Sequence, residues 1–275
     1  MKTDSGKQPQ NVIAVVPARL SSTRLPNKLL LPLAGKPLIL RTIGQAKKAR
    51  NISRVIVATD SEEILRVVLE SGSEAVLTST NHQSGSDRIA EVAENLPVGS
   101  IIVNVQGDEP MISPRTIEKA VDAILENDSI QMATTCESIH EAQDVLSSDV
   151  VKVVTDENDF ALYFSRSPIP FPREAVKRFG SLDNALREDK KLISQFRKHT
   201  GLYIYRREYL LEYTKLKQTD LEKTEMLEQL RALENGAKIK VVEVADISIG
   251  VDTREDFVRV EKIIEAERIT RGGED

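Results

Sequence analysis

The sequence predicts an α/β fold, with a mostly parallel, twisted sheet and helices on both of its faces. Through the first half of the chain, short apolar runs alternate with amphipathic segments, as in strand–helix–strand units. The runs are continuously apolar and rich in Val and Ile, which is typical of strands buried on both faces. Polar loops follow several runs directly, and open α/β sheets bind ligands at the carboxyl ends of their strands.

The first half of the chain contains four expected strands and four expected helices. The strands are expected at residues 12–16, 54–59, 75–77 and 101–105, and the helices at about 37–50, 60–72, 86–95 and 113–127. Pro37 suits a first helical turn, where its missing N–H would have no partner. Asp60 with Glu63 is typical of a capping box, which predicts the start of the second helix.

The pattern changes between about residues 131 and 213. Strand-like runs at 132–136, 150–155, 161–165 and 201–205 come without regular helices, and residues 171–189 are rich in proline and charge. We interpret this region as an inserted, partly antiparallel lobe. The α/β rhythm then resumes with a helix at 224–236 and a strand at 239–244, and Thr253 with Asp256 caps a last helix to about residue 268. We therefore expect a disordered tail at 1–10 and a single domain at 11–270 with an inserted lobe at about 131–213.

The composition is that of a globular protein that binds neither nucleic acid nor membranes. Of 275 residues, 40% are apolar and 29% are charged, and the net charge is −5, whereas nucleic-acid binding depends on a basic surface. Cys136 is the single cysteine, so no internal disulfide can form and a reducing compartment is expected. The N-terminus has no apolar stretch of a signal peptide, and no run reaches the length of a membrane helix. We expect a cytoplasmic protein.

In two acidic segments far apart in the chain, the pattern predicts a strand that ends on a carboxylate. Asp108 lies in the segment 103–110 and Asp252 in the segment 250–256. Magnesium prefers hard oxygen ligands and takes one or two carboxylates together with substrate phosphates. The pair therefore predicts Mg²⁺ chemistry on a nucleoside triphosphate. For Asp252, simple capping of the following helix is the alternative.

The loop after the first strand carries Arg19, Arg24 and Lys28 together with three hydroxyl residues. Arginine offers a planar fork of donors to phosphate oxygens, and lysine offers a mobile point charge. The glycine-rich dinucleotide and P-loop motifs are absent from the sequence, so side chains would have to supply this phosphate site. A solvated basic loop is the alternative.

Together these motifs resemble the 3-deoxy-manno-octulosonate cytidylyltransferases, or CMP-Kdo synthetases, from about residue 11 to 264. The matching segments are Val16-Pro17-Ala18-Arg19, Ser22-Thr23-Arg24-Leu25-Pro26, Gly35-Lys36-Pro37, Val57-Ala58-Thr59-Asp60, His82-Gln83-Ser84-Gly85, Asn104-Val105-Gln106-Gly107-Asp108-Glu109-Pro110, Ala161-Leu162-Tyr163-Phe164-Ser165-Arg166, His199, Gly201-Leu202-Tyr203, Glu228-Gln229-Leu230-Arg231 and Gly250-Val251-Asp252-Thr253. The resemblance implies a Rossmann-like nucleotidyltransferase fold. It also implies a reaction in which CTP and Kdo give CMP-Kdo and pyrophosphate, for lipopolysaccharide or capsule synthesis.

The resemblance further implies a role for each matching residue. Mg²⁺ would bind Asp108 and Asp252, and with these Arg19 and Lys28 would be catalytic. The nucleotide would contact Ala18, Arg19, Ser22, Thr23, Lys28, Gln83, Ser84, Gly85, Arg88, Gln106 and Asp108. The acidic sugar would contact Arg166, His199, Tyr203, Glu228 and Gln229. For the turn at 83–88, helix capping by Ser86 or Asp87 is the alternative.

Three questions stay open from the sequence: the sugar substrate, catalysis against nucleotide binding alone, and the role of residues 131–213. The segment 248–256 departs from the family's usual Gly-Thr-Gly-Val-Asp-Thr-Pro-Glu-Asp, which leaves 8-amino-Kdo as an alternative substrate. A sialic-acid-type sugar is a third candidate substrate, and a catalytically silent nucleotide-binding module of the same fold is the competing interpretation. We also expect a homodimer through residues 131–213, because strand edges and apolar residues there need a covering surface, although this region could instead serve as a lid.

Overall fold

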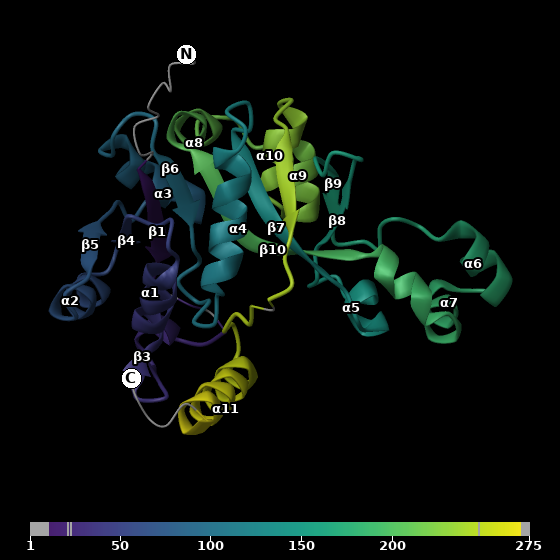
Figure 1. Cartoon of the computed structure of the whole chain (residues 1–275), viewed down its shortest axis with the longest axis horizontal. Coiled ribbons are helices and arrows are strands. Elements are labelled where there is room, and N and C mark those ends of the chain that lie inside the picture. Colours follow the sequence, from purple (N-terminus) through teal and green to yellow (C-terminus); the bar gives the residue numbers. More distant parts are fainter. Residues whose placement is uncertain (1–10, 21, 23, 247, 271–275) are drawn as a thin grey trace, which may run out of the picture. The chain divides into compact units, whose positions relative to one another are not determined.

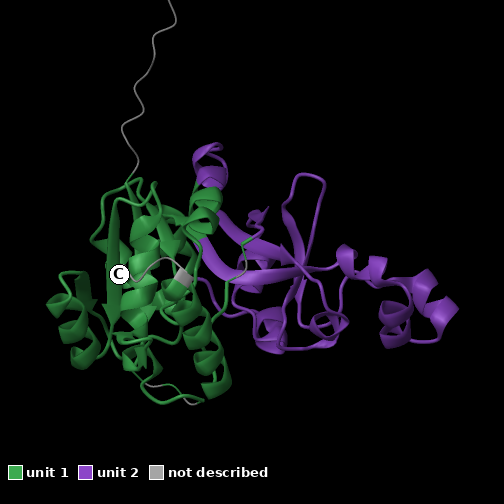
Figure 2. Cartoon of the chain, turned by 60° about the horizontal axis from the view of Figure 1, so that its bottom comes forward, with its two compact units in different colours: residues 1–121, 204–214, 246–275 green, residues 122–203, 215–245 purple. Residues whose placement is uncertain are grey.

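The computed structural model describes residues 11–20, 22, 24–246 and 248–270. The chain forms two compact units (Figure 2): unit 1 comprises residues 1–121, 204–214 and 246–275, and unit 2 comprises residues 122–203 and 215–245. The tail expected at 1–10 and the loop residue Thr23 lie outside the described residues. A single domain with an inserted lobe at 131–213 stays a prediction.

Unit 1 is built on parallel strands in the order β6-β1-β4-β5 (Figure 1). These are β1 (Val12–Ala18), β4 (Arg54–Thr59), β5 (Glu74–Leu77) and β6 (Ile101–Asn104). In register, Val15 of β1 lies opposite Ile56 on one side and Asn104 on the other. The first five residues of β1 are all buried, as expected for a central strand with neighbours on both sides.

The helices of unit 1 are α1 (Leu38–Lys48), α2 (Glu62–Glu70), α3 (Gly85–Glu94), α8 (Arg207–Tyr213) and α11 (Arg254–Thr270), while α4 (Pro114–Leu125) ends within unit 2. Side-chain oxygens cap α2, α3 and α11 of unit 1, whereas α1 and α8 begin without a side-chain cap, and α8 is not expected from the sequence. The expected Asp60–Glu63 capping box at α2 is wrong, because the Ser61 hydroxyl caps the helix by accepting from the Ile64 N–H. At α11 the expected cap is confirmed, since the Thr253 hydroxyl accepts from the Asp256 N–H.

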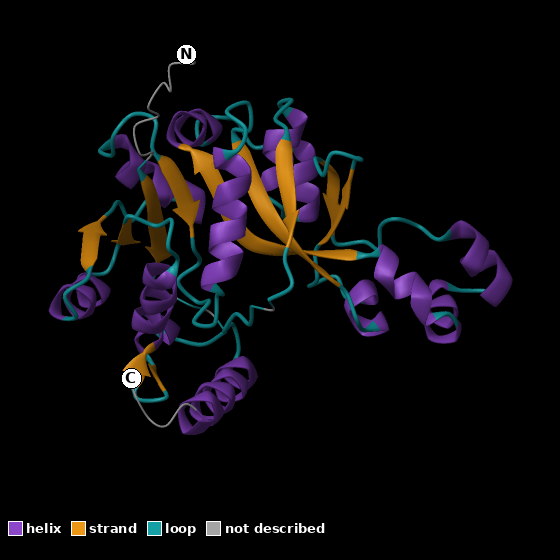
Figure 3. Ribbon diagram, viewed as in Figure 1, coloured by secondary structure: helices purple, strands orange, loops and turns teal. Residues whose placement is uncertain are grey.

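Unit 2 combines parallel and antiparallel strands (Figure 3). Strand β11 (Ile239–Glu243) runs parallel to β7 (Met132–Ser138), and β7 neighbours β10 (Arg197–Arg206), whose last three residues belong to unit 1. Strand β8 (Lys152–Thr155) pairs antiparallel with both β9 (Ala161–Ser165) and β10. The expected antiparallel character of this region is confirmed.

The expected absence of helices in this region is wrong, and so is the single helix at 224–236. Unit 2 contains α5 (Ala142–Leu146), α6 (Arg173–Phe179), α7 (Leu182–Glu188) and the 3-10 helix η2 (Lys190–Gln195). In place of one helix at 224–236 it has α9 (Asp220–Glu225) and α10 (Gln229–Glu234). The break falls at Met226, whose φ of 53° is left-handed and ends α9. The two short helices are joined by an ion pair in which the Arg231 guanidinium donates to both oxygens of Glu222.

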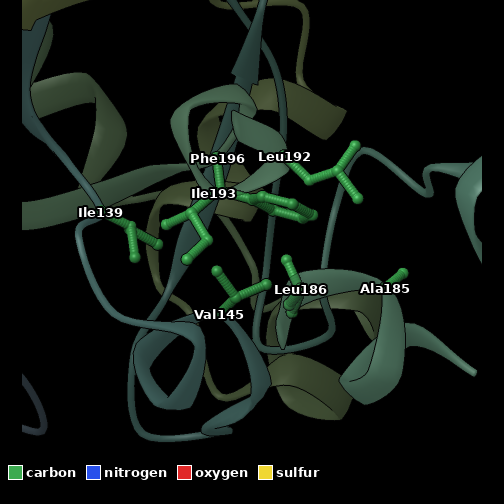
Figure 4. Packing of buried hydrophobic residues seen from close by; sticks show 7 residues of the cluster. All are labelled: Ile139, Val145, Ala185, Leu186, Leu192, Ile193 and Phe196. Atoms are coloured by element: carbon green, nitrogen blue, oxygen red, sulfur yellow. The ribbon is translucent and has the colours of Figure 1, made fainter. Parts of the chain in front are cut away.

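A small apolar core joins α5, α7 and η2 of unit 2, with α6 packed against it (Figure 4). Its buried residues are Ile139, Val145, Ala185, Leu186, Leu192, Ile193 and Phe196. The figure shows the Phe196 ring among side chains from the helical segments around it. The proline- and charge-rich stretch therefore folds because its few apolar residues meet in one cluster.

Phe196→Ala should lower the free energy of unfolding by about 3–5 kcal/mol, because it empties a fully buried aromatic site. Phe171→Ala is the matched control, since the Phe171 side chain is 62% exposed and its loss should cost only about 0.5 kcal/mol. Urea denaturation followed by circular dichroism measures both values. Equal losses in the two variants would contradict the assignment of the cluster as a core.

Candidate active site

Three segments of unit 1 meet at the side chain of Lys28. This residue begins the 3-10 helix η1 (Lys28–Leu30), just after the loop that follows β1. Its Nζ donates to Asp108 Oδ2 at 2.5 Å and to Asp252 Oδ1 at 2.8 Å. The third N–H of the ammonium donates to the Val251 carbonyl at 3.0 Å. The two predicted metal ligands are therefore brought together, with a cation between them.

The charges of this cluster compensate one another. Burial alone would lower the pKa of Lys28, but the carboxylates of Asp108 and Asp252 outweigh it and raise that pKa above its ordinary value. Arg24 adds a second cation, with its Nη2 at 3.0 Å from Asp252 Oδ2. Capping of α11 falls to Thr253 and Asp256, so the Asp252 carboxylate faces these cations and not the helix.

Close packing fixes the backbone beneath the cluster. A Cβ on Gly107 would lie 2.9 Å from the Pro17 carbonyl oxygen, so this position requires glycine. The buried Thr42 hydroxyl donates to the Gly107 carbonyl at 2.9 Å. The Val251 N–H donates to the Asp108 carbonyl at 2.8 Å, which ties the two acidic segments together. Asp108 and Asp252 are thus held on backbone that has little freedom to move.

A cavity of about 340 Å³ opens next to the cluster. It is lined by Pro17, Arg19, Ser22, Arg24, Lys28, Leu29, Gly85, Gln106, Gly107, Asp108 and Asp252. Most of the side chains predicted to contact the phosphates therefore line a single cavity of unit 1. A cavity with three cationic side chains and two carboxylates suits a polyanion that carries a divalent cation.

The turn that begins α3 lies at this cavity through Gly85, and two of its polar side chains, Ser84 and Asp87, cap the helix. The Ser84 hydroxyl accepts from the Asp87 N–H, and the Asp87 carboxylate accepts from the Ser84 N–H. The capping alternative thus holds for Asp87, whereas Ser86 is buried. Gln83 is exposed, and its amide donates to the Asn81 carbonyl.

Arg88 does not reach the cavity in this structure. Its side chain is fully buried, and its guanidinium donates to Asp60 Oδ2 and Thr78 Oγ1, both at 2.6 Å. It therefore joins the ends of β4 and β5 to α3, and its nucleotide contact stays a prediction. Ala18 is buried at the end of β1, and Arg19 donates from Nη2 to the His82 carbonyl.

The predicted sugar-binding residues all belong to unit 2. Arg166 follows β9, and its Nε donates to the Glu225 carbonyl at 2.8 Å while its Nη1 donates to the Ser148 carbonyl at 2.9 Å. Glu228 lies at the start of α10, and the next residue, Gln229, is buried. The site roles of these residues stay predictions.

His199 lies on β10 among aromatic rings. Its ring centroid is 5.0 Å from that of Phe164 and 5.3 Å from that of Tyr203. Desolvation lowers the pKa of His199 to about 3, so its imidazole is neutral at physiological pH. The Thr134 hydroxyl donates to the Leu202 carbonyl, which assigns the His199 Nε2–H as donor to Thr134 Oγ1 at 2.9 Å. Nδ1 then remains an acceptor.

Sequence reasoning missed three polar residues that organise these sites. Asp60 was assigned to a helix cap, although it pairs with Arg88. Lys152 and Glu225 bond to the backbone of Arg166. A lysine inside the apolar run Val150-Val151-Lys152-Val153-Val154 was a signal for Lys152, because lysine is rarely buried without a partner.

Within the residues that the structure describes, no helix has the length and apolar character needed to span a membrane. The cytoplasmic location expected from the sequence stays a prediction.

Comparison with known proteins gives concordant matches. Residues 13–239 match the cytidylyltransferase family. Over 90% of its length the chain is 49% identical to a 3-deoxy-manno-octulosonate cytidylyltransferase of Trichlorobacter lovleyi, of which it covers 95%. It is 46% identical over 91% of its length to the enzyme of the same name from Geobacter sulfurreducens, of which it covers 98%.

Solved structures extend the comparison to the fold. The structure of CMP:2-keto-3-deoxy-manno-octonic acid synthetase complexed with CTP is 37% identical and matches with a TM-score of 0.84, over 94% of this chain and all of that one. A 4-diphosphocytidyl-2C-methyl-D-erythritol synthase from Anaerococcus prevotii matches over 94% of this chain and all of its own at 14% identity, with a TM-score of 0.58. The predicted α/β fold is confirmed.

The neutral state of His199 predicts a pH dependence of stability. In the unfolded chain the imidazole takes up a proton below about pH 6.5, whereas the folded state resists it until about pH 3. The unfolded state therefore binds more protons in this window, and stability falls as the pH falls through it. Between pH 7 and 5 this contribution is up to about 2 kcal/mol.

Denaturation of wild type and His199→Gln at pH 7 and 5 measures this contribution. The variant should lose less stability on acidification than the wild type. His140→Gln, at an exposed position, should leave the wild-type pH dependence in place. An identical pH dependence in wild type and His199→Gln would rule out a neutral, desolvated His199.

Proposed function

Because the chain belongs to the cytidylyltransferase family, we propose that it activates 3-deoxy-manno-octulosonate (Kdo) with CTP, giving CMP-Kdo and pyrophosphate for lipopolysaccharide synthesis. The observation that carries the proposal is the convergence of Asp108, Asp252 and Lys28 on one cavity of unit 1. The two relatives named above carry this activity in their names and align with nearly the whole chain.

The carboxylates fit a magnesium ion. Oxygens of Asp108 and Asp252 both contact the same cationic atom, Lys28 Nζ, so two hard donors already converge on a single positive centre. In the described part of the chain, no group of three His, Cys, Asp or Glu side chains could hold a metal ion. A bound Mg²⁺ would thus complete its coordination with phosphate oxygens and water, and would supply charge neutralisation at the α-phosphate.

The cationic side chains supply the rest of the catalytic effect. Nucleotidyl transfer needs little covalent help and gains chiefly from positioning and charge neutralisation. Arg19 and Lys28 stabilise the pyrophosphate that departs as the sugar hydroxyl attacks. All three N–H groups of Lys28 are used by Asp108, Asp252 and Val251, so contact with a phosphate requires Lys28 to exchange at least one of these acceptors.

The residues of unit 2 are proposed to bind the acidic sugar. Arg166 provides a guanidinium for the carboxylate, and the neutral His199 provides Nδ1 as acceptor for a sugar hydroxyl. Tyr203, Glu228 and Gln229 complete the proposed set. In unit 1, Ala18, Ser22, Thr23, Gln83, Ser84, Gly85, Arg88 and Gln106 are proposed to support the nucleotide.

We further propose a homodimer in the cytoplasm. Phe171 and Leu162 expose most of their apolar side chains in the region where the dimer contact is expected. Light scattering at micromolar concentration distinguishes the mass of two chains from that of one.

A pyrophosphate-release assay with CTP, UTP or ATP, combined in turn with Kdo, 8-amino-Kdo or sialic acid, tests the proposed function. We expect release with CTP and Kdo in the presence of Mg²⁺. Asp108→Asn should fold but lose roughly two to three orders of magnitude in turnover, because it removes charge from the metal site. Asp220→Asn is the control, since this carboxylate lies fully exposed on α9 and should keep wild-type turnover.

Two results would contradict the proposal. A wild-type enzyme that releases pyrophosphate with none of the sugar acids would refute the activity. Wild-type turnover in Asp108→Asn would refute the role of the carboxylate pair.

A further inference from the structure

Unit 2 contains a lysine whose burial is unusual. Lys152 is the first residue of β8, and its side chain is 0% exposed. Removing an ammonium from water is costly unless strong acceptors replace the water. In the described residues its nitrogen makes no ion pair with a carboxylate. Burial therefore lowers the pKa of Lys152.

Three backbone carbonyls hold the ammonium instead. Lys152 Nζ donates to the carbonyls of Val150 and Arg166, both at 2.6 Å, and to that of Ser147 at 2.8 Å. Every N–H of the charged form thus has an acceptor. Carbonyl oxygens stabilise the charge, but they do not cancel it as a carboxylate would.

This arrangement joins both sides of Arg166. On one side, Lys152 binds the Arg166 carbonyl, and β8 places Lys152 opposite Ser165 in the β8–β9 ladder. On the other side, the Arg166 N–H donates to Glu225 Oε2 at 3.0 Å, and the Ser165 hydroxyl donates to Glu225 Oε1 at 2.6 Å. The backbone of Arg166 is thereby fixed from its carbonyl and from its N–H.

The segment that binds the Lys152 ammonium also holds the side chain of Arg166. Its Nη1 donates to the Ser148 carbonyl, in the same short segment that supplies the Ser147 and Val150 carbonyls to Lys152. Lys152 therefore shapes the segment 147–150, which in turn orients the guanidinium. A change at Lys152 would be transmitted to Arg166 through both contacts.

The cluster has one positive charge in excess. It contains two cations, Lys152 and Arg166, and one carboxylate, Glu225, which accepts from a hydroxyl and a backbone N–H. Burial is the main cause of the lowered pKa of Lys152; the charge of Arg166 adds to the lowering, and the carboxylate of Glu225 opposes it. The Lys152 ammonium is buried, whereas Arg166 and Glu225 are half-buried, so water screens this excess of positive charge only in part, which favours an anionic ligand.

We propose that Lys152 is a positioning residue for Arg166, and that its buried charge makes this part of unit 2 select a carboxylate over a neutral group. The inference rests on the proposed function, because it identifies the carboxylate of the sugar acid as the group selected. Lys152 itself touches no substrate. It acts by fixing the backbone and the segment that orient Arg166 and by adding positive potential.

Lys152→Met tests the proposal, since it keeps most of the side-chain length and removes the charge. Steady-state assays should compare free Kdo with its uncharged methyl ester and should report KM for CTP separately. We expect KM for Kdo to rise roughly ten- to a hundredfold, as for loss of a charge-assisted interaction, while KM for CTP stays within about twofold. The preference for the acid over the ester should fall by a similar factor.

Lys198→Met is the matched control. Lys198 lies opposite Lys152 in the β8–β10 ladder, but its side chain is partly exposed and its nitrogen is 3.9 Å from Glu137. It should retain the wild-type preference for the acid. An unchanged acid-to-ester preference in Lys152→Met, or equal rises in both KM values, would overturn the proposal.

Lys152→Met leaves three buried carbonyls without a donor and could therefore fail to fold. In that case a second variant tests the proposal. Lys152→Arg keeps the charge but changes the donor geometry, so KM for Kdo should rise while the acid preference persists. Loss of that preference in Lys152→Arg would contradict the role of the charge. A wild type that uses no sugar acid would instead refute the proposed function, which separates the two failures.

Discussion

The contact of Lys28 with two carboxylates is the interaction on which the candidate active site depends. Asp108 follows β6 and Asp252 precedes α11, so 144 residues separate them in sequence, and side by side they would repel each other. One ammonium between them offsets this repulsion and joins the two acidic segments to the start of η1. The carboxylate oxygens of Asp108 and Asp252 that converge there are hard ligands suited to Mg²⁺, with the phosphates of a bound nucleotide as further ligands.

The charged clusters around Lys28 and around Lys152 are held by different kinds of hydrogen-bond acceptor. In unit 1, cations and carboxylates are paired side chain to side chain at the rim of a cavity, where partners can exchange. In unit 2, Lys152 is buried and bonded to backbone carbonyls, which cannot exchange without local unfolding. The first arrangement suits groups that must change partners during a reaction, and the second suits groups that must stay fixed.

Much of unit 1 could be predicted because its strands are continuous apolar runs with polar residues at their ends. Both Asp108 and Asp252 are expected at strand ends; this is confirmed for Asp108, which follows β6, and wrong for Asp252, because the described residues between β11 and α11 form no strand. The structure nevertheless brings the two carboxylates together on Lys28. The ion pair between Arg88 and Asp60 could not be predicted in the same way, because the two residues are far apart in sequence and neither local pattern contains the other. The nucleotide contact of Arg88 stays a prediction.

Unit 2 was less predictable, because its elements are short and depend on tertiary contacts. The helices of residues 141–195 have few apolar positions each and are stable through a shared cluster around Phe196. The break between α9 and α10 depends on left-handed Met226 and on the Glu222–Arg231 pair, and a periodic helix pattern does not show either. Lys152 was visible only as an exception inside an apolar strand.

The most direct measurement of the central interaction is a double-mutant cycle on unfolding free energy in metal-free buffer. The cycle combines Lys28→Met with Asp108→Asn, and the exposed pair Arg187 and Asp183 of α7 serves as the reference cycle. We predict a coupling of about 1–3 kcal/mol for Lys28 with Asp108, and about 0–1 kcal/mol for the exposed pair. Additive effects of Lys28→Met and Asp108→Asn would contradict the account, because they would show that the ammonium does not join the carboxylates.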